Sequence, residues 1–88
     1  MHLLLEIVNE KGLHARASAK FVETVERFEA SALVSRDGME VSGDSIMGLL
    51  MLGAGPGTSI EVTVEGADAA PLAEALRALV EGRFGEAN

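Results

Sequence analysis

Residues 31–42 read SALVSRDGMEVS, and this segment predicts a fold that contains a β-sheet. Two short strand-like runs, residues 31–36 and 39–42, lie on either side of the dipeptide Asp37-Gly38. That dipeptide suits a two-residue type I′ turn, because both central positions of the turn need a positive φ angle. The segment therefore predicts a tight antiparallel hairpin near the middle of the chain.

Two segments outside this hairpin also have the pattern of β-strands. Residues 60–65 alternate apolar and polar side chains, which is typical of a strand with one buried face. Residues 3–8 are apolar except for Glu6 and predict a largely buried strand that ends before Gly12. The chain thus offers four strands to a single sheet.

Three segments between and after the strands predict helices. Apolar residues recur at a 3.6-residue spacing from Ala15 to Phe28, as in an amphipathic helix. Residues 46–52 are apolar on all sides and stop at a glycine-rich run, which indicates a short helix with some apolar surface left exposed. Asp68 is the expected N-cap of a last helix that ends at Gly82.

The resulting order is β-α-β-β-α-β-α, which predicts an α+β fold of two layers with the helices on one face of the sheet. An 88-residue chain has room for one such core, and no repeat or linker divides it. We therefore predict a single domain over residues 1–88.

Composition excludes several classes of function. The net charge of -7 argues against binding to nucleic acid or to an anionic membrane. The chain has no cysteine and two histidines, so neither a disulfide framework nor a structural zinc site is expected, and we predict no metal or other cofactor. No apolar run is long enough to span a membrane and no signal peptide is recognisable, so we expect a soluble cytoplasmic protein.

The most concentrated candidate site is Lys11-Gly12-Leu13-His14-Ala15-Arg16, which joins the first strand to the first helix. His14 is expected at the helix N-terminus, where unpaired N–H groups and the positive end of the helix dipole favour an anion. A neutral imidazole nitrogen there could attack phosphorus, with Arg16 placed to receive the charge. A solvated cap is the commoner role for a lone loop histidine. Ser18 and Ser45, however, lie in no recognisable nucleophile motif.

Two separated motifs resemble one known family. Gly12-Leu13-His14-Ala15-Arg16 followed by Phe21-Val22, and Ser45-Ile46-Met47-Gly48 followed by Leu52-Gly53, are similar to HPr, the histidine-containing phosphocarrier of the bacterial phosphoenolpyruvate-dependent phosphotransferase system. The resemblance covers essentially the whole chain. It implies an open-faced β-sandwich, with a four-stranded antiparallel sheet and three helices on one face.

The resemblance also implies a function. His14 would be phosphorylated on Nδ1 by enzyme I and would pass the group to a IIA-type acceptor, with Arg16 beside the phosphate. The chain would be a carrier without turnover of its own, serving sugar uptake or a regulatory, nitrogen-related relay. The alternative belongs to another class of function. It is a non-enzymatic domain that binds an anion, a small ligand or a protein, in which His14 is only an anion-binding cap.

The second motif adds a surface and a regulatory hypothesis. Ile46, Met47 and Leu50 are the apolar residues that we expect at the docking surface for partner proteins, although a plain core role is the alternative. Ser45 is first an N-cap. By resemblance it is also a target for a dedicated HPr kinase/phosphorylase, and a phosphate there would oppose transfer through His14.

The sequence departs from the family pattern at several positions. Ala17-Ser18 replaces the Pro-Ala that is common there, which changes the stiffness of the first helical turn. Asp44 stands where lysine is frequent, which puts recognition of Ser45 by a kinase in doubt. Glu23 and Glu26 occupy a helix face that is basic in some members, so partner choice could differ.

Overall fold

The computed structural model describes residues 1–87, so Asn88, the last residue of the predicted domain, lies outside the described residues. The chain order is β1 (His2–Glu6), α1 (Ala15–Glu26), β2 (Ser31–Arg36), β3 (Met39–Ser42), α2 (Ile46–Met51), β4 (Ser59–Glu65) and α3 (Ala69–Glu81), followed by the single 3-10 turn η1 (Arg83–Gly85). The predicted β-α-β-β-α-β-α order is confirmed, and η1 is an addition to it.

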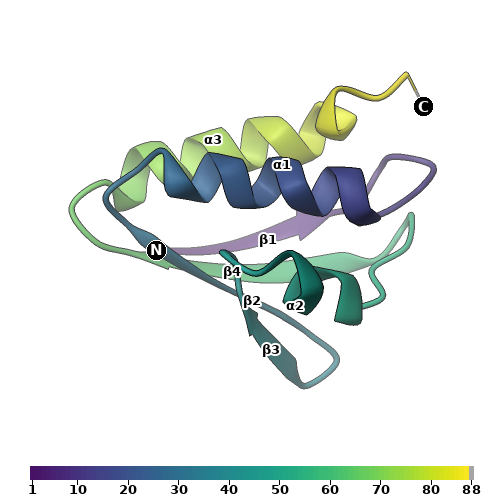
Figure 1. Ribbon diagram of the computed structural model, residues 1–88, viewed down its shortest axis with the longest axis horizontal. Coiled ribbons are helices and arrows are strands. Elements are labelled where there is room, and N and C mark those ends of the chain that lie inside the picture. The colour runs from purple at the N-terminus through teal and green to yellow at the C-terminus, as the bar shows by residue number, and fades with distance from the viewer. Residues whose placement is uncertain (88) are drawn as a thin grey trace.

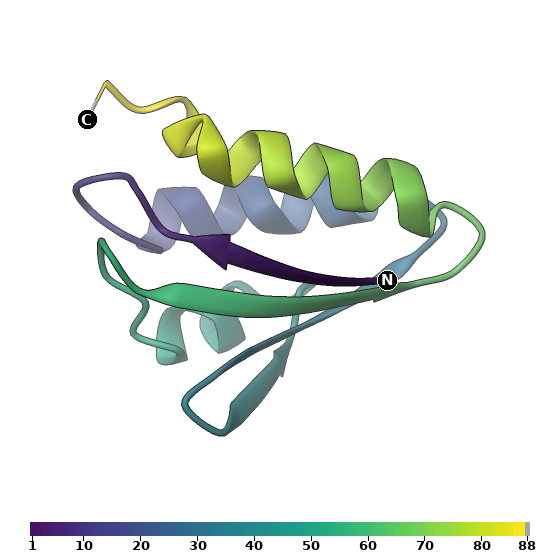
Figure 2. The same cartoon turned by 180° about the vertical axis from the view of Figure 1, so that it is seen from behind.

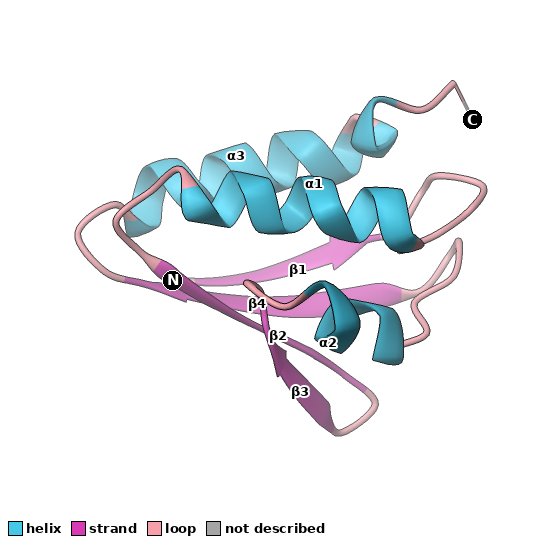
Figure 3. Cartoon of the chain, viewed as in Figure 1, coloured by secondary structure: helices cyan, strands magenta, loops and turns pink. Residues whose placement is uncertain are grey.

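The four strands form one antiparallel sheet in the order β1-β4-β2-β3. The helices form the second layer, with α1 and α3 side by side above the sheet and α2 next to α1 (Figures 1 and 3). The hairpin β2-β3 turns at Asp37 and Gly38, whose φ angles of 51° and 81° are both positive. These features confirm the open-faced sandwich and its central hairpin.

One prediction for the first strand is wrong. Leu3 and Leu5 in β1 are buried, but Leu4 between them is 65% exposed. Seen from behind in Figure 2, the helices lie on one side of the sheet and leave its other face uncovered. Successive side chains of a strand point to opposite faces, so an apolar run in such a sheet is buried at alternate positions only.

The core lies between the sheet and the helices. Phe21 of α1 and Phe84 of η1 are fully buried, and aliphatic side chains fill the rest of the interior. The helices α1 and α3 turn their apolar stripes inward, as expected for amphipathic helices. Across residues 1–87, no helix combines the length and the apolar character needed to cross a bilayer.

The last helix begins where the sequence indicated but is not capped as expected. Asp68 occupies the N-cap position of α3, yet its side chain makes no capping bond. Instead, its Oδ2 accepts a 2.8 Å hydrogen bond from the backbone N–H of Glu29. The side chain therefore ties the start of α3 to the turn that follows α1.

Candidate functional site

A tight turn after β1 places His14. Gly12 in this turn has a φ of 68°, and a Cβ there would lie 2.7 Å from the carbonyl oxygen of Ala54. The next residue, Leu13, donates its N–H to that same oxygen at 2.9 Å. Glycine at position 12 thus lets the turn pack directly against the loop after α2, which fixes the point where α1 begins.

His14 is the N-cap residue of α1. Its backbone is extended, with φ -79° and ψ -176°, and its carbonyl accepts the N–H of Ser18 at 2.8 Å, the first bond of the helix. Within residues 1–87, the N–H groups of Ala15, Arg16 and Ala17 donate to no acceptor. His14 therefore lies at the helix N-terminus, and unpaired donors of this kind favour an anion.

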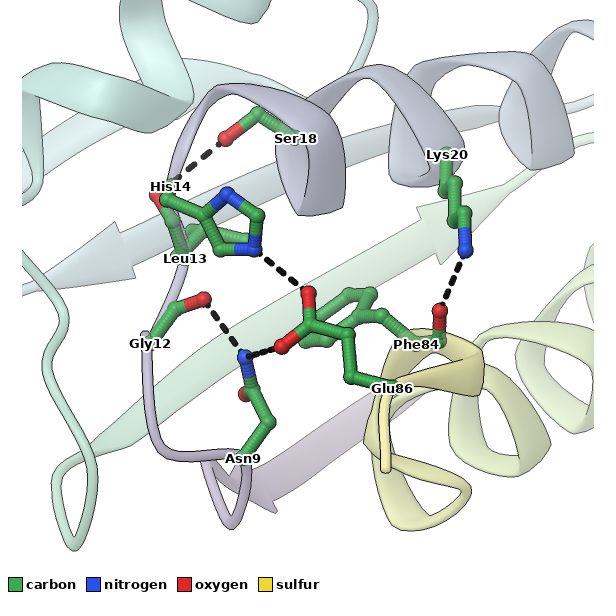
Figure 4. Close-up of polar contacts among 8 residues, drawn as sticks. All are labelled: Asn9, Gly12, Leu13, His14, Ser18, Lys20, Phe84 and Glu86. Carbon is green, nitrogen blue, oxygen red and sulfur yellow. Dashed lines mark hydrogen bonds and ion pairs between the residues drawn. The ribbon is translucent and has the colours of Figure 1, made fainter. Parts of the chain in front are cut away.

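The imidazole of His14 is held by a residue that sequence reasoning missed. Its Nε2 lies 2.5 Å from Oε2 of Glu86, which follows η1 (Figure 4). The other carboxylate oxygen of Glu86 accepts from Nδ2 of Asn9 at 3.0 Å, and that amide also donates to the carbonyl of Gly12 at 2.8 Å. The site therefore joins the turn after β1 to the segment after α3.

This contact fixes the roles of the ring nitrogens. The pKa of Glu86 is lowered, first by its hydrogen bond with His14 and then by the bond with Asn9, so the carboxylate is ionised at neutral pH. A carboxylate only accepts, so Nε2 carries the proton. Figure 4 shows the second nitrogen, Nδ1, turned away from Glu86 toward the first turn of α1, and it has no partner among residues 1–87.

A surface hollow of about 270 Å³ surrounds the ring. It is lined by Glu10, Lys11, His14, Arg16, Glu86 and Ala87. Arg16 is exposed and makes no ion pair within the described part of the chain, so its guanidinium is available to an anion in the hollow. No group of three or more His, Cys, Asp or Glu side chains in residues 1–87 is arranged to hold a metal ion.

The departure at Ala17-Ser18 leaves this geometry in place. Ala17 is fully buried in the first turn of α1. Ser18 is also fully buried, and its hydroxyl donates to the carbonyl of Leu13 at 3.3 Å. That extra bond ties the first turn to the residue before His14, in place of the rigidity that proline would give.

Ser45 caps α2 at the other end of α1. Its Oγ accepts the N–H of Gly48 at 3.0 Å, as predicted for an N-cap. The preceding Asp44 lies beside Glu26 at the end of α1, and its carboxyl group, with the nearby charge of Glu23, raises the pKa of Glu26. Ser45 is not among the residues that line the hollow around His14.

α2 exposes apolar side chains beside α1. Ile46 is 39% exposed and Met47 68%, whereas Leu50 is half-buried and Leu49 belongs to the core. The sequence did not single out Met51, which is 64% exposed and more accessible than Leu50. Because α2 is too short to hide a full apolar stripe, this patch remains open to solvent.

Comparison with known proteins gives a consistent match. The family model described as the PTS HPr component phosphorylation site matches residues 4–82. The phosphocarrier protein HPr of Neisseria meningitidis is 49% identical over 82 residues, which cover 93% of this chain and 92% of the relative.

Solved structures agree with the sequence match. The crystal structure of HPr-C-His from Thermoanaerobacter tengcongensis superposes with a TM-score of 0.94 at 38% identity, covering 100% of this chain and 99% of that one. HPr from Bacillus anthracis gives a TM-score of 0.86 at 39% identity, covering 91% of this chain and 95% of that one. The similarity thus extends over the whole fold.

Proposed function

The chain belongs to the HPr family of phosphotransferase-system phosphocarriers, and we propose from this that His14 is the residue that carries the phosphoryl group. Members of this family are carriers and have no catalytic turnover of their own. The donor would be an enzyme I-like protein charged from phosphoenolpyruvate, and the acceptor a IIA-type protein. The exchange would take place in the cytoplasm, in sugar uptake or in regulation.

One observation carries the proposal: the free Nδ1 of His14 faces the start of α1. Nε2 is occupied by Glu86, so Nδ1 is the nitrogen with a lone pair available for attack. In the transfer, that lone pair forms the new N–P bond while the bond between phosphorus and the donor's histidine nitrogen breaks. Both bonds are phosphoramidates, so the exchange is close to balanced and can run in either direction.

Arg16 and the start of α1 would stabilise the transferred group. Nδ1 faces the first turn of α1, where the backbone N–H groups are unpaired. Arg16 adds a charged donor to the same hollow. Positioned donors of this kind stabilise the charge that develops on the phosphoryl oxygens. Without a covalent role of its own, Arg16 acts through this stabilisation.

The exposed patch on α2 would receive the partner proteins. Ile46, Met47 and Leu50 provide adaptable apolar contacts beside α1, which suits a surface that must bind a donor and an acceptor in turn. A phosphate on Ser45, added by an HPr kinase/phosphorylase, would place negative charge at the edge of this patch. Since Ser45 does not line the hollow at His14, such a phosphate would act on docking.

The direct test is the intact mass of the protein after incubation with phosphoenolpyruvate and enzyme I. We expect the gain of one phosphoryl group, lost in acid and stable in base, and no gain in His14→Ala. If a demonstrably active donor adds nothing to the native chain, the carrier role is refuted. Reversible binding of phosphate without a covalent adduct would then favour the alternative of an anion-binding domain.

A further inference from the structure

The segment after α3 reaches the imidazole of His14 through Glu86. We propose that Glu86, held in place by Asn9, is a positioning residue that fixes the Nε2–H form of His14 and so makes Nδ1 the nucleophile. The inference rests on the phosphocarrier function proposed above and assigns it a further residue. Glu86 lies beyond residues 4–82, the part of the chain that the family match covers.

The segment is fixed well enough to place a carboxylate. Phe84 is fully buried, and both Arg83 and Phe84 have left-handed backbones, with φ angles of 60° and 55°. Non-glycine residues adopt such angles only where the surroundings hold them. The carbonyl of Phe84 accepts a 2.6 Å hydrogen bond from Nζ of Lys20 on α1, which ties the sharp turn to the helix that His14 begins.

Asn9 determines which way the carboxylate of Glu86 faces. Asn9 is fully buried, and its amide group bridges the carbonyl of Gly12 and Oε1 of Glu86. With Oε1 occupied in this way, Oε2 is left for Nε2 of His14. One buried amide thereby holds both the loop that presents His14 and the carboxylate that orients it.

In this arrangement the carboxylate of Glu86 and the phosphoryl group would lie at different nitrogens of the imidazole ring. Glu86 lies at Nε2, while the helix start, which favours an anion, lies on the side of Nδ1. When Nδ1 bonds to phosphorus, the ring becomes cationic because the Nε2 proton stays in place. The carboxylate then faces that positive charge directly, and the phosphoryl group sits away from it. The proton moves no further than the hydrogen bond between Nε2 and Oε2.

Glu10 is a natural control for charge alone. It lines the same hollow and is exposed, and it makes no hydrogen bond from its side chain among residues 1–87. Glu10→Ala removes the same charge as Glu86→Ala without touching the ring. A difference between the two variants therefore reports the contact with His14.

The first measurement is the NMR of the His14 ring nitrogens and their protons in the free protein. We expect Nε2 to carry a proton protected from exchange with water in the native chain and in Glu10→Ala. In Glu86→Ala that protection should be lost and both tautomers should appear, while Glu86→Gln should recover part of it through its remaining acceptor oxygen. An unprotected Nε2 proton in the native chain, or an unchanged ring in Glu86→Ala, would overturn the inference.

The second measurement is the rate of single-turnover transfer from phosphorylated enzyme I. We expect Glu86→Ala to be slower by about tenfold, by analogy with the loss of a partner that orients a metal-ligating histidine. Glu10→Ala, which removes the same charge but no contact with the ring, should not be slowed. A native rate in Glu86→Ala would reduce Glu86 to a structural contact. If the native chain itself accepts no phosphoryl group, the proposed function fails, and the ring NMR still decides whether Glu86 positions His14.

Discussion

Nζ of Lys20, in the middle of α1, donates a 2.6 Å hydrogen bond to the carbonyl oxygen of Phe84 in η1. The two residues are far apart in the chain, and their contact brings the segment after α3 back along the helix that starts at His14. Glu86 reaches the imidazole because this turn is held.

Lys20→Met should weaken the attachment of η1 while its side chain keeps the packing of the lysine stem. We expect a loss of about 1 kcal/mol in the free energy of unfolding, since the bond involves a charged donor that is partly exposed. Urea unfolding gives the value. The same variant should also reduce the protection of the Nε2 proton of His14, and an unchanged ring spectrum would show that η1 is held without Lys20.

Gly12→Ala should be markedly more destabilising than Gly53→Ala. Both glycines have positive φ angles, 68° and 62°, so each substitution carries a left-handed strain of about 1 to 2 kcal/mol. Only at position 12 would the new Cβ also meet backbone atoms, whereas position 53 has nothing within 4 Å. Equal losses in thermal or urea unfolding would contradict the packing described for the turn before His14.

The stability that Glu86 contributes should depend on pH. Its pKa is lowered from 4.5 in the folded protein by hydrogen bonds with His14 and Asn9. A lowered pKa means that the contribution is present above pH 4.5 and is lost as the pH falls through the lowered value. Native protein and Glu86→Ala should therefore differ in unfolding free energy at pH 6 and converge in acid. A difference that grows toward low pH would have the wrong sign.

Ser45 allows capping and charge to be tested separately. Ser45→Ala should lower stability by about 1 kcal/mol, because it removes the bond to the N–H of Gly48. Ser45→Asp keeps a capping oxygen and adds negative charge, so we expect native-like stability with slower transfer from enzyme I. If Ser45→Asp transfers at the native rate, the regulatory hypothesis for this residue is dropped.

Met47→Ala should slow transfer from a subsaturating donor by about fivefold, as expected for loss of an apolar anchor worth about 1 kcal/mol. Leu4→Ala is the matched control, since Leu4 is similarly exposed, 65% against 68%, but lies on the uncovered face of the sheet. The two variants should have similar stability. Equal transfer rates in the two variants would contradict the proposal that partner proteins dock on α2.

Much of the fold could be predicted because it is encoded locally. Asp37-Gly38 needs positive φ angles at both positions, and the structure has them. The burial of β1 was predicted wrongly from its apolar run. A strand buried on both faces and a strand of an open-faced sheet can have the same run of apolar residues, and the run does not show what covers the second face. Asp68 was placed at the right position, but nothing local showed that its side chain would bond to Glu29.

The site was predictable only in part. His14 and Arg16 are close in sequence, and the helix that follows them places both at one hollow. The contact of Glu86 with His14 could not be predicted from the sequence. It depends on a left-handed turn at Arg83 and Phe84, and the pattern of residues does not indicate such a turn. Asn9 gave no signal either, because its amide bridge becomes evident only when Glu86 is in place.

The strand order has a consequence for synthesis on the ribosome. β1 pairs only with β4 in this sheet, and β1 ends at Glu6 whereas β4 begins at Ser59. At ordinary translation speeds, roughly 3 to 12 s pass between completion of the first strand and completion of its partner. During that interval Leu3, Leu4 and Leu5 have no neighbouring strand, and the hairpin β2-β3 is the first part of the sheet that can form. The first strand of a nascent chain therefore stays unpaired through most of its synthesis, and the sheet closes only when β4 is complete.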